Sequence, residues 1–304
     1  MDKRSVTESL VSIVEEPQIR QDAYSNEGPL IHHPTGDVAF GGCIVGQAVS
    51  AALATVPTEF KFIALQSSFL RPIRASKKVI YHVERTTDGR RFATRVVTVT
   101  QSTDDHAPCL YTAIVSFQKP SSSDAEEKVR DYHSPMPEVG DTIPHRVPQR
   151  GFRQFGFGQS AEDDEKNDPV EWRPISLLSP SDPLQIRAHG FVRVPPLSTS
   201  SYAVHIATMA YMSDESLLGL VLLTDPKAAS KDIRSLAMTT TLTHQISFHS
   251  FSIRADEWMV CESSRSWAAS GRIFLLQRFW SLSSGRLLMS STQEAIITRP
   301  KASL

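Results

Sequence analysis

The feature that most constrains the fold is a pattern that occurs twice, a helix-like segment followed by four strand-like segments. In residues 41–56, apolar side chains recur at helical spacing behind a glycine pair. Four β-branched, alternating runs follow, and Asp88-Gly89 between two of them is a hairpin turn signal. One helix followed by a run of strands is an α+β pattern and not a βαβ winding.

The second copy matches the first in order and in length. Residues 198–223 are helical in their first half and precede four more alternating runs. Phe69 to Phe117 and Phe248 to Ile296 both span 48 residues. Two tandem copies of one unit indicate a fused dimer. A long helix wrapped by an antiparallel sheet is the hotdog architecture, so we predict an α+β double hotdog whose sheets join edge to edge around a pseudo-twofold axis.

This pattern divides the chain into three parts. Residues 1–120 form the predicted N-terminal hotdog, in which the first 30 residues are an amphipathic cap. Residues 121–168 are rich in Pro, Ser and acidic side chains without a sustained period, which predicts a mobile linker across the surface. Residues 169–304 form the predicted C-terminal hotdog.

Composition excludes several classes of protein. The formal net charge of −1 over 304 residues argues against a nucleic-acid-binding surface or a polybasic membrane anchor. The cysteines Cys43, Cys109 and Cys261 have no metal-ligand spacing, which favours a reduced intracellular protein and no bound metal. No run of 18 apolar residues occurs. We expect a cytoplasmic location; the C-terminal KASL only loosely resembles a peroxisomal signal.

A carboxamide stands among apolar positions of the last predicted strand. Gln293 alternates with Leu287, Met289, Ala295 and Ile297, so it shares their face. A buried amide without partners costs about 1–3 kcal/mol, so Gln293 must be hydrogen-bonded. It is either a structural amide that ties strands together or part of a site.

Six ordered blocks resemble a known family. They are AFGGCIVGQAVSAA, SSFLRP, KKVIYHVERTTDGRRFATRVVTVTQ, YMSDESLL, TLTHQISFH and SSTQEA, and they occur in order within a match that runs from about residue 28 to 297. The blocks are similar to those of the type II acyl-CoA thioesterases, double-hotdog hydrolases of medium- and long-chain substrates. The resemblance implies hydrolysis of acyl-CoA to free acid and CoA, in lipid metabolism or on a specialised fatty-acyl or polyketide-like substrate. No metal or redox cofactor is implied.

The resemblance also implies a water-activating set of Asp214, Thr241 and Gln293. A carboxylate with a pKa of about 4 is ionised at pH 7 and can accept a proton from water, while a hydroxyl and an amide oxygen can orient that water. Each residue has a plainer interpretation. Asp214 could be a solvated helix-end carboxylate, and strict alternation places Thr241 on the more polar face of its strand.

Candidate substrate-binding residues are Arg90, Arg91, Gly41 and Gly42. Helix N-termini offer backbone N–H groups to a developing oxyanion, although the sequence does not say which amide serves. The cations of the first sheet, which also include Lys77, Lys78 and Arg95, could meet the phosphates of coenzyme A, but most are expected on a solvated face. The strand histidines His244 and His249 are expected to be satisfied by neighbours, since G-x-S-x-G and HExxH motifs are absent.

Two positions depart from the family pattern. Cys43 replaces a usual Gln, and because it lies in the first repeat, away from the implied site, we expect it to pack in the core. Thr243 replaces a usual Asp, which could change the pocket or the substrate.

Two other functions remain open. A hotdog hydratase, dehydratase or pathway-specific release enzyme would need an Asp/His pair, for which His32, His33 and Asp37 are candidates. A non-catalytic acyl-thioester binder is the second alternative. The expected partner is acyl-CoA or a carrier-bound acyl thioester, and we expect a homo-oligomer.

Overall fold

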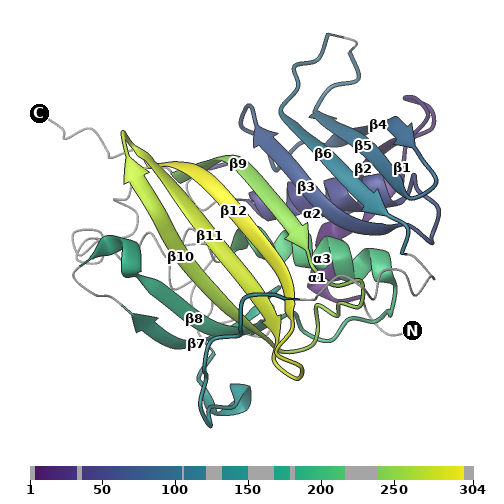
Figure 1. The fold of residues 1–304 in the computed structure, drawn as a ribbon. Helices are drawn as coiled ribbons and strands as arrows, with labels where there is room; N and C mark the ends of the chain where they lie inside the picture. Colours follow the sequence, from purple (N-terminus) through teal and green to yellow (C-terminus); the bar gives the residue numbers. More distant parts are fainter. Residues whose placement is uncertain are drawn as a thin grey trace, which may run out of the picture.

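The computed structural model describes residues 4–32, 36–104, 106–120, 132–149, 168–178, 182–215 and 239–297. These residues form one curved antiparallel sheet that wraps around a pair of central helices (Figure 1). No helix in these ranges is long and apolar enough to span a membrane.

The sheet has twelve strands in the order β1-β2-β4-β5-β6-β3-β9-β12-β11-β10-β8-β7. The first six in the chain are β1 (Ile13–Glu15), β2 (Ala23–Asn26), β3 (Lys61–Phe69), β4 (Ile80–Asp88), β5 (Phe92–Thr100) and β6 (Tyr111–Gln118). The other six are β7 (Glu171–Leu178), β8 (Arg187–Arg193), β9 (Thr239–Phe248), β10 (Met259–Ala269), β11 (Arg272–Ser281) and β12 (Leu287–Ile297). The order of the second half mirrors the first, which confirms the predicted tandem arrangement.

The two halves join where β3 pairs with β9, and Gln66 lies directly opposite Gln245. These two glutamines occupy the same position in the two copies, since both stand three residues before the phenylalanine at the start of each 48-residue repeat. The junction therefore lies on the pseudo-twofold axis, and each half covers a sheet edge of the other.

Three helices lie on the inner side of the sheet. Helix α1 (Val6–Val11) begins with a capping box in which the Ser5 hydroxyl and the Glu8 carboxylate each accept the other residue's backbone N–H. Helices α2 (Gly41–Leu53) and α3 (Tyr202–Glu215) pack against each other.

Small residues allow this close helix contact. A Cβ on Gly42 would lie 2.7 Å from the Tyr211 carbonyl oxygen, and one on Gly46 would lie 3.0 Å from the Ala207 carbonyl oxygen. Because both obstacles are backbone atoms of α3, glycines 42 and 46 set the distance between the helices. This contact carries the first turn of α2 to the end of α3.

The expected Asp88-Gly89 hairpin is confirmed, because β4 ends at Asp88 and the Gly89 N–H donates a hydrogen bond to the Phe92 carbonyl.

The expected position of Arg95 needs correction. Arg95, expected among solvated cations, is fully buried. Its guanidinium donates to the Thr55 hydroxyl at 2.8 Å and to the Asp88 carboxylate at 2.6 Å, so it joins the end of α2 to the sheet.

The predicted linker is described only in part, because residues 121–131 and 150–167 lie outside the described ranges. Residues 132–149 form no strand or α-helix and contain a 3-10 turn at Pro144–Arg146. The Ser134 carbonyl accepts a hydrogen bond from the Trp280 indole at 2.8 Å, and the Val147 carbonyl accepts one from Arg173 at 2.6 Å. This piece is therefore attached to the C-terminal half of the sheet. Strands β7 and β8, which precede α3, were not predicted from the sequence.

Candidate active site

The structure brings together Asp214 and Gln293, which are 79 residues apart in the chain. Asp214 lies in the last turn of α3 and is 3% exposed, while Gln293 lies on β12 and is fully buried. The Gln293 side-chain amide donates a short hydrogen bond from Nε2 to Oδ1 of Asp214. The inward position of Gln293 agrees with the alternation in the sequence, since Met289, Ser291 and Ala295 on the same strand are also buried. The alternation does not extend to Leu287, because a bulge places Leu287 opposite Trp280 and turns Leu288 into the core instead.

The carboxylate of Asp214 rests on the first turn of α2. The Gly42 backbone N–H donates a hydrogen bond to it. A Cβ on Gly41 would lie 2.6 Å from Asp214 Oδ2, so only glycine leaves room for the carboxylate there. A helix N-terminus carries unsatisfied N–H groups and a partial positive charge, and both favour an anion. Gly41 and Gly42 are therefore part of the same site as Asp214.

Burial and hydrogen bonding act on Asp214 in opposite directions. Burial raises the pKa of Asp214 to about 6, although the hydrogen bonds from Gln293 and Gly42 favour the ionised form. Burial also raises the pKa of the adjacent Glu215 well above its ordinary value, and the charges of Asp168 and Asp214 add to the effect. The site therefore holds a carboxylate with a pKa of about 6 beside a second carboxylate whose pKa is also raised by burial.

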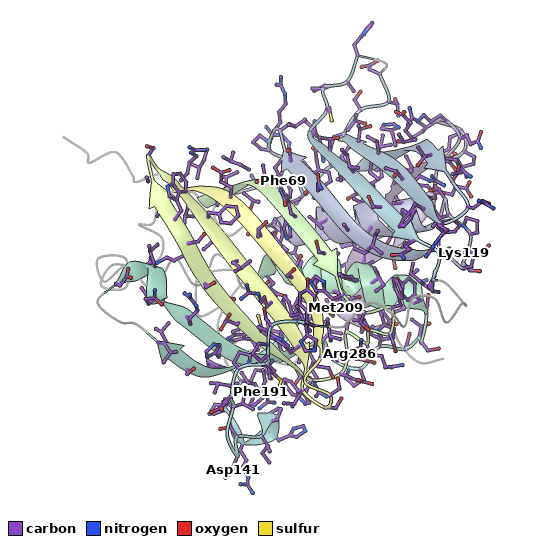
Figure 2. All side chains as sticks on the ribbon, in the orientation of Figure 1. Phe69, Lys119, Asp141, Phe191, Met209 and Arg286 are labelled. Carbon is purple, nitrogen blue, oxygen red and sulfur yellow. The ribbon has the colours of Figure 1, made fainter. Side chains whose placement is uncertain are left out.

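Aromatic side chains of the N-terminal half form the wall beside Asp214. Phe69 ends β3 and stacks edge-to-face on Tyr111 at the start of β6, with ring centroids 4.9 Å apart. The Phe69 ring tip would lie 3.2 Å from a Cβ on Gly41, which places it against the first turn of α2. Figure 2 shows Phe69 near the junction of β3 and β9. Residues of both repeats therefore build this one site.

A bulge in β9 decides where Thr241 lies. Gln293 pairs with His244, but Ala295 pairs with Thr241, so β9 has one extra residue between these pairs. Ala295 shares the inner face with Gln293, and the bulge therefore returns Thr241 to that face, contrary to strict alternation. Thr241 is half-buried there, and among the residues that the structure describes no hydrogen bond joins it to Asp214 or Gln293.

Sequence reasoning did not assign His244 and Ser213 to the site. His244 is fully buried directly opposite Gln293, and its Nε2 lies 3.1 Å from the Ser213 hydroxyl. The alternation of His244 with the buried Ile246 and Phe248 was the signal that could have placed it inward. His249 behaves as expected, because its Nε2 lies 2.9 Å from the Ser290 hydroxyl.

Arg90 and Arg91 are not brought to Asp214. They form the turn between β4 and β5, beside Phe92, which pairs with Gln118 at the far end of β6 from Tyr111. Tyr111 and Gln118 are seven residues apart on a strand, a length of about 23 Å. Lys78, another cation of the first sheet, forms an ion pair with Glu16.

The two departures from the family pattern lie where sequence analysis did not expect them. Cys43 is in the first turn of α2, one residue after Gly42, and thus close to Asp214. It does pack in the core, since it is fully buried, and burial raises the pKa of its thiol to about 12. Thr243 pairs with Glu294 on the outer face of the sheet, so it does not line the site.

The groups considered for a hydratase do not converge on the buried site. Asp37 is exposed and accepts the Ser76 backbone N–H at 2.8 Å, and His32 is exposed in an isolated bridge with Ala39. His33 lies outside the described residues. Within the described ranges, no group of three or more His, Cys, Asp and Glu side chains could hold a metal ion.

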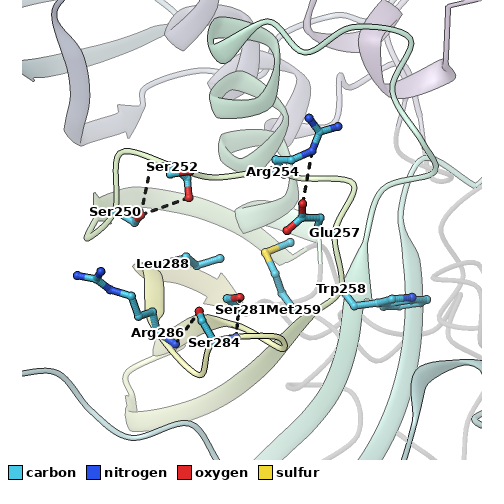
Figure 3. Close-up of a pocket in the computed structure, with 10 residues that line it drawn as sticks. All are labelled: Ser250, Ser252, Arg254, Glu257, Trp258, Met259, Ser281, Ser284, Arg286 and Leu288. Atoms are coloured by element: carbon cyan, nitrogen blue, oxygen red, sulfur yellow. Dashed lines mark hydrogen bonds and ion pairs between the residues drawn. The ribbon is translucent and has the colours of Figure 1, made fainter.

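A separate surface hollow of about 180 Å³ lies between the loop after β9 and the turn before β12 (Figure 3). Its lining includes Arg254 and Arg286 among several serines, and Arg254 is ion-paired with Glu257. This hollow adjoins the beginning of α3, because the Ala255 N–H donates to His205. Nine residues of helix, about 13 Å, separate His205 from Asp214, so the hollow is distinct from the candidate active site.

Comparison with known proteins identifies the family. A profile of the acyl-CoA thioesterase N-terminal domain matches residues 30–118, and the C-terminal domain profile matches residues 137–297. Acyl-coenzyme A thioesterase 8 of Rattus norvegicus is 27% identical over 315 residues, covering 99% of this chain and 92% of that protein. Peroxisomal acyl-coenzyme A thioester hydrolase 1 of Saccharomyces cerevisiae is 22% identical over 306 residues, covering 85% of each chain.

Solved structures confirm the double-hotdog fold. The acyl-CoA thioesterase II TesB2 of Mycobacterium marinum superposes with a TM-score of 0.74 at 24% identity, covering 98% of this chain and 100% of that one. Because the two domain profiles match in tandem and together span most of the sequence, this chain belongs to the acyl-CoA thioesterase family and is a thioester hydrolase.

Proposed function

We propose that Asp214 is the general base of acyl-CoA hydrolysis and that Gln293 holds it in place. The observation that carries this proposal is a buried carboxylate, fixed by Gln293 and by the first turn of α2, whose pKa of about 6 leaves it ionised at pH 7. Asp214 accepts a proton from a water molecule while the water oxygen attacks the thioester carbonyl carbon. When the carbon–sulfur bond breaks, that proton goes to the leaving sulfur, giving a free acid and the CoA thiol.

The backbone N–H of Gly41 is the proposed donor to the oxyanion. The Gly42 N–H is already bonded to Asp214, and the Gly41 N–H has no acceptor among the described residues. The N-terminal charge of α2 favours negative charge that develops on the carbonyl oxygen. Thr241 is the proposed third member of the set, with its hydroxyl orienting the water, because the bulge places it on the same face as Gln293.

The finer assignments are also proposals. We propose hotdog units at residues 1–120 and 169–304, joined by residues 121–168. Acyl-CoA is the proposed donor, and a carrier-bound or polyketide-like thioester is the variant to compare with it.

A homo-oligomer is supported by Phe92 and Ile114, large apolar side chains that are 54% and 49% exposed on neighbouring strands. Cytoplasm is the proposed compartment because the three cysteines are unpaired, and the peroxisome is the alternative because the yeast relative is named a peroxisomal hydrolase.

Release of free thiol from short, medium and long acyl-CoAs tests the function. The wild-type protein should release CoA, and Asp214→Asn should reduce kcat by about 10²–10⁴-fold, the usual contribution of a general base. Asp256→Asn is the matched control, because Asp256 is a mostly buried carboxylate beside His205 near the other end of α3. Turnover that Asp214→Asn leaves unchanged would remove Asp214 from the mechanism, and substrate binding without thiol release would favour a non-catalytic binder.

A further inference from the structure

His244 is attached to the candidate active site from two sides. It lies directly opposite Gln293 in the β9–β12 pair, so the two side chains share the inner face with Cβ atoms about 5 Å apart. It also contacts Ser213, the residue before Asp214 on α3, at 3.1 Å. Since Gln293 itself bonds Asp214, both neighbours of His244 are direct neighbours of the proposed base.

The contact with Ser213 determines which ring nitrogen of His244 carries the proton. The Ser213 hydroxyl donates its single hydrogen to the Ala210 carbonyl at 2.7 Å. Its oxygen must therefore accept from His244, so the proton is on Nε2 and Nδ1 has a free lone pair. Burial lowers the pKa of His244 to about 3, which keeps the ring neutral at any pH where the enzyme works.

Two buried acceptors are left without partners at this point. Neither His244 Nδ1 nor Gln293 Oε1 has a hydrogen-bond donor in the described part of the chain. The hydrogen bond from Nε2 to Asp214 fixes the orientation of the Gln293 amide, because the flipped amide would place Oε1 against the Asp214 carboxylate. A buried acceptor without a donor is destabilising, so two on facing residues of the β9–β12 pair indicate a hydrogen-bond donor that occupies the site.

We propose that His244 is a positioning residue of the hydrolysis, whose Nδ1 accepts the hydrogen of the attacking water that Asp214 does not remove. Gln293 Oε1, on the residue that faces His244 across the strand pair, shares that hydrogen in a three-centre hydrogen bond. With one hydrogen directed to Asp214 and the other to His244 and Gln293, the water keeps a lone pair for the thioester carbon. This inference rests on the proposed function and adds a residue to it.

A pair of substitutions separates the two nitrogens of the ring. His244→Asn places an oxygen where Nδ1 stood and loses the bond to Ser213, whereas His244→Gln can keep that bond and loses the acceptor at Nδ1. We expect His244→Asn to keep kcat within about threefold and His244→Gln to lower kcat about tenfold at unchanged KM, with kcat expressed per folded molecule. The opposite order would show that His244 serves only the structural bond to Ser213, and would overturn the proposal.

Ser213→Ala provides a second measurement if His244→Gln fails to fold. Without the serine oxygen, nothing holds the ring proton on Nε2, and a ring protonated on Nδ1 cannot accept from water. We expect a several-fold loss of kcat at unchanged KM, and an unchanged kcat would overturn the proposal. Failure of the proposed function has a different signature, because then Asp214→Asn would retain activity whatever the His244 variants do.

Discussion

At the scale of single residues, the proposed base Asp214 shows how opposing contacts set the pKa of a carboxylate. Burial alone disfavours its charge, and the donors Gln293 and Gly42 restore enough stability for the carboxylate to ionise close to neutral pH. A fully solvated carboxylate would ionise at any physiological pH but would be a weaker base. The activity of this enzyme should therefore depend on pH in the range where Asp214 titrates.

The first prediction concerns that pH dependence. Because only ionised Asp214 can accept a proton, kcat/KM should be half-maximal near pH 6 and fall about tenfold per pH unit below it. Gln293→Leu removes a hydrogen bond that favours the carboxylate, so this acid limb should move to higher pH while kcat falls about 10–100-fold. Gln245→Leu, on the exposed outer face of β9, is the control. A limb that Gln293→Leu leaves in place would contradict the role of the amide.

The second prediction concerns stability. The pKa of Asp214 is about 6 in the folded protein and near the ordinary 3.8 when unfolded, so the folded state binds the proton more tightly. The contribution of Asp214 to stability therefore decreases as pH rises from about 4 to about 6, and the cost persists above that range. Asp214→Asn should raise the free energy of unfolding by about 1–3 kcal/mol at pH 7 and by almost nothing at pH 4. Thermal unfolding at both pH values measures this difference, and equal shifts at the two would contradict it.

At the scale of elements, helix α2 has two glycines that make room for different neighbours. Gly41 faces the Asp214 carboxylate, whereas Gly46, further along α2, faces Val11 and the backbone of α3. The first glycine makes room for a functional group and the second makes room for a neighbouring helix. Substituting each by alanine should therefore separate activity from stability.

The third prediction follows from this difference. Gly41→Ala places a methyl group 2.6 Å from Asp214 Oδ2 and should displace the carboxylate, which lowers kcat at least tenfold. Gly46→Ala meets Val11 Cγ1 at 2.9 Å and the Ala207 carbonyl at 3.0 Å, so it should lower the free energy of unfolding by about 1–2 kcal/mol. Steady-state kinetics and thermal unfolding of both variants test this. Loss of activity per folded molecule in Gly46→Ala alone would reverse the assignment.

The local pattern of the sequence predicted the elements well because the signals are local. The helix expected at residues 41–56 is α2 at Gly41–Leu53, and period-two alternation placed Gln293 on the inner face. The bulge that turns Thr241 inward has no comparable signal, because an extra residue in β9 is defined only by its pairing with β12. The same limit applied to Arg95, whose burial depends on acceptors at Thr55, forty positions earlier in the chain.

The contacts within the candidate site were harder to predict from the sequence than the residues that form it. Asp214 and Gln293 were identified through resemblance to a family, and the structure adds the contact with the first turn of α2. That contact is made between the two repeats, so neither repeat alone contains it. For this reason Cys43 was expected to lie away from the site although it follows Gly42 directly.

At the scale of the whole molecule, the pseudo-twofold axis relates the polar residue His244 in the C-terminal half to an apolar residue in the N-terminal half. By the equivalence of Gln66 and Gln245, the position of His244 corresponds to Leu65. Leu65 pairs with Val115 as His244 pairs with Gln293, and both apolar side chains are fully buried. In the described residues, the N-terminal counterparts of His244 and Gln293 are therefore apolar. The buried Arg95, which pairs with Val115, donates to Thr55 and Asp88.

The fourth prediction is that each chain binds one substrate molecule productively. A symmetric hotdog dimer would offer two equivalent sites across its axis, whereas this fused pair has the polar pair of His244 and Gln293 in only one half and Leu65 and Val115 in the other. Calorimetric titration with a non-hydrolysable acyl-CoA analogue should give a stoichiometry of one per chain. Because the added methyl group would lie 2.6 Å from Asp214 Oδ2 and crowd the site, Gly41→Ala should weaken this binding event, while Val115→Ala at the apolar counterpart should leave the stoichiometry at one. Two equivalent binding events per chain would mean that the apolar half also accepts substrate, and the asymmetry between the repeats would then not explain where hydrolysis occurs.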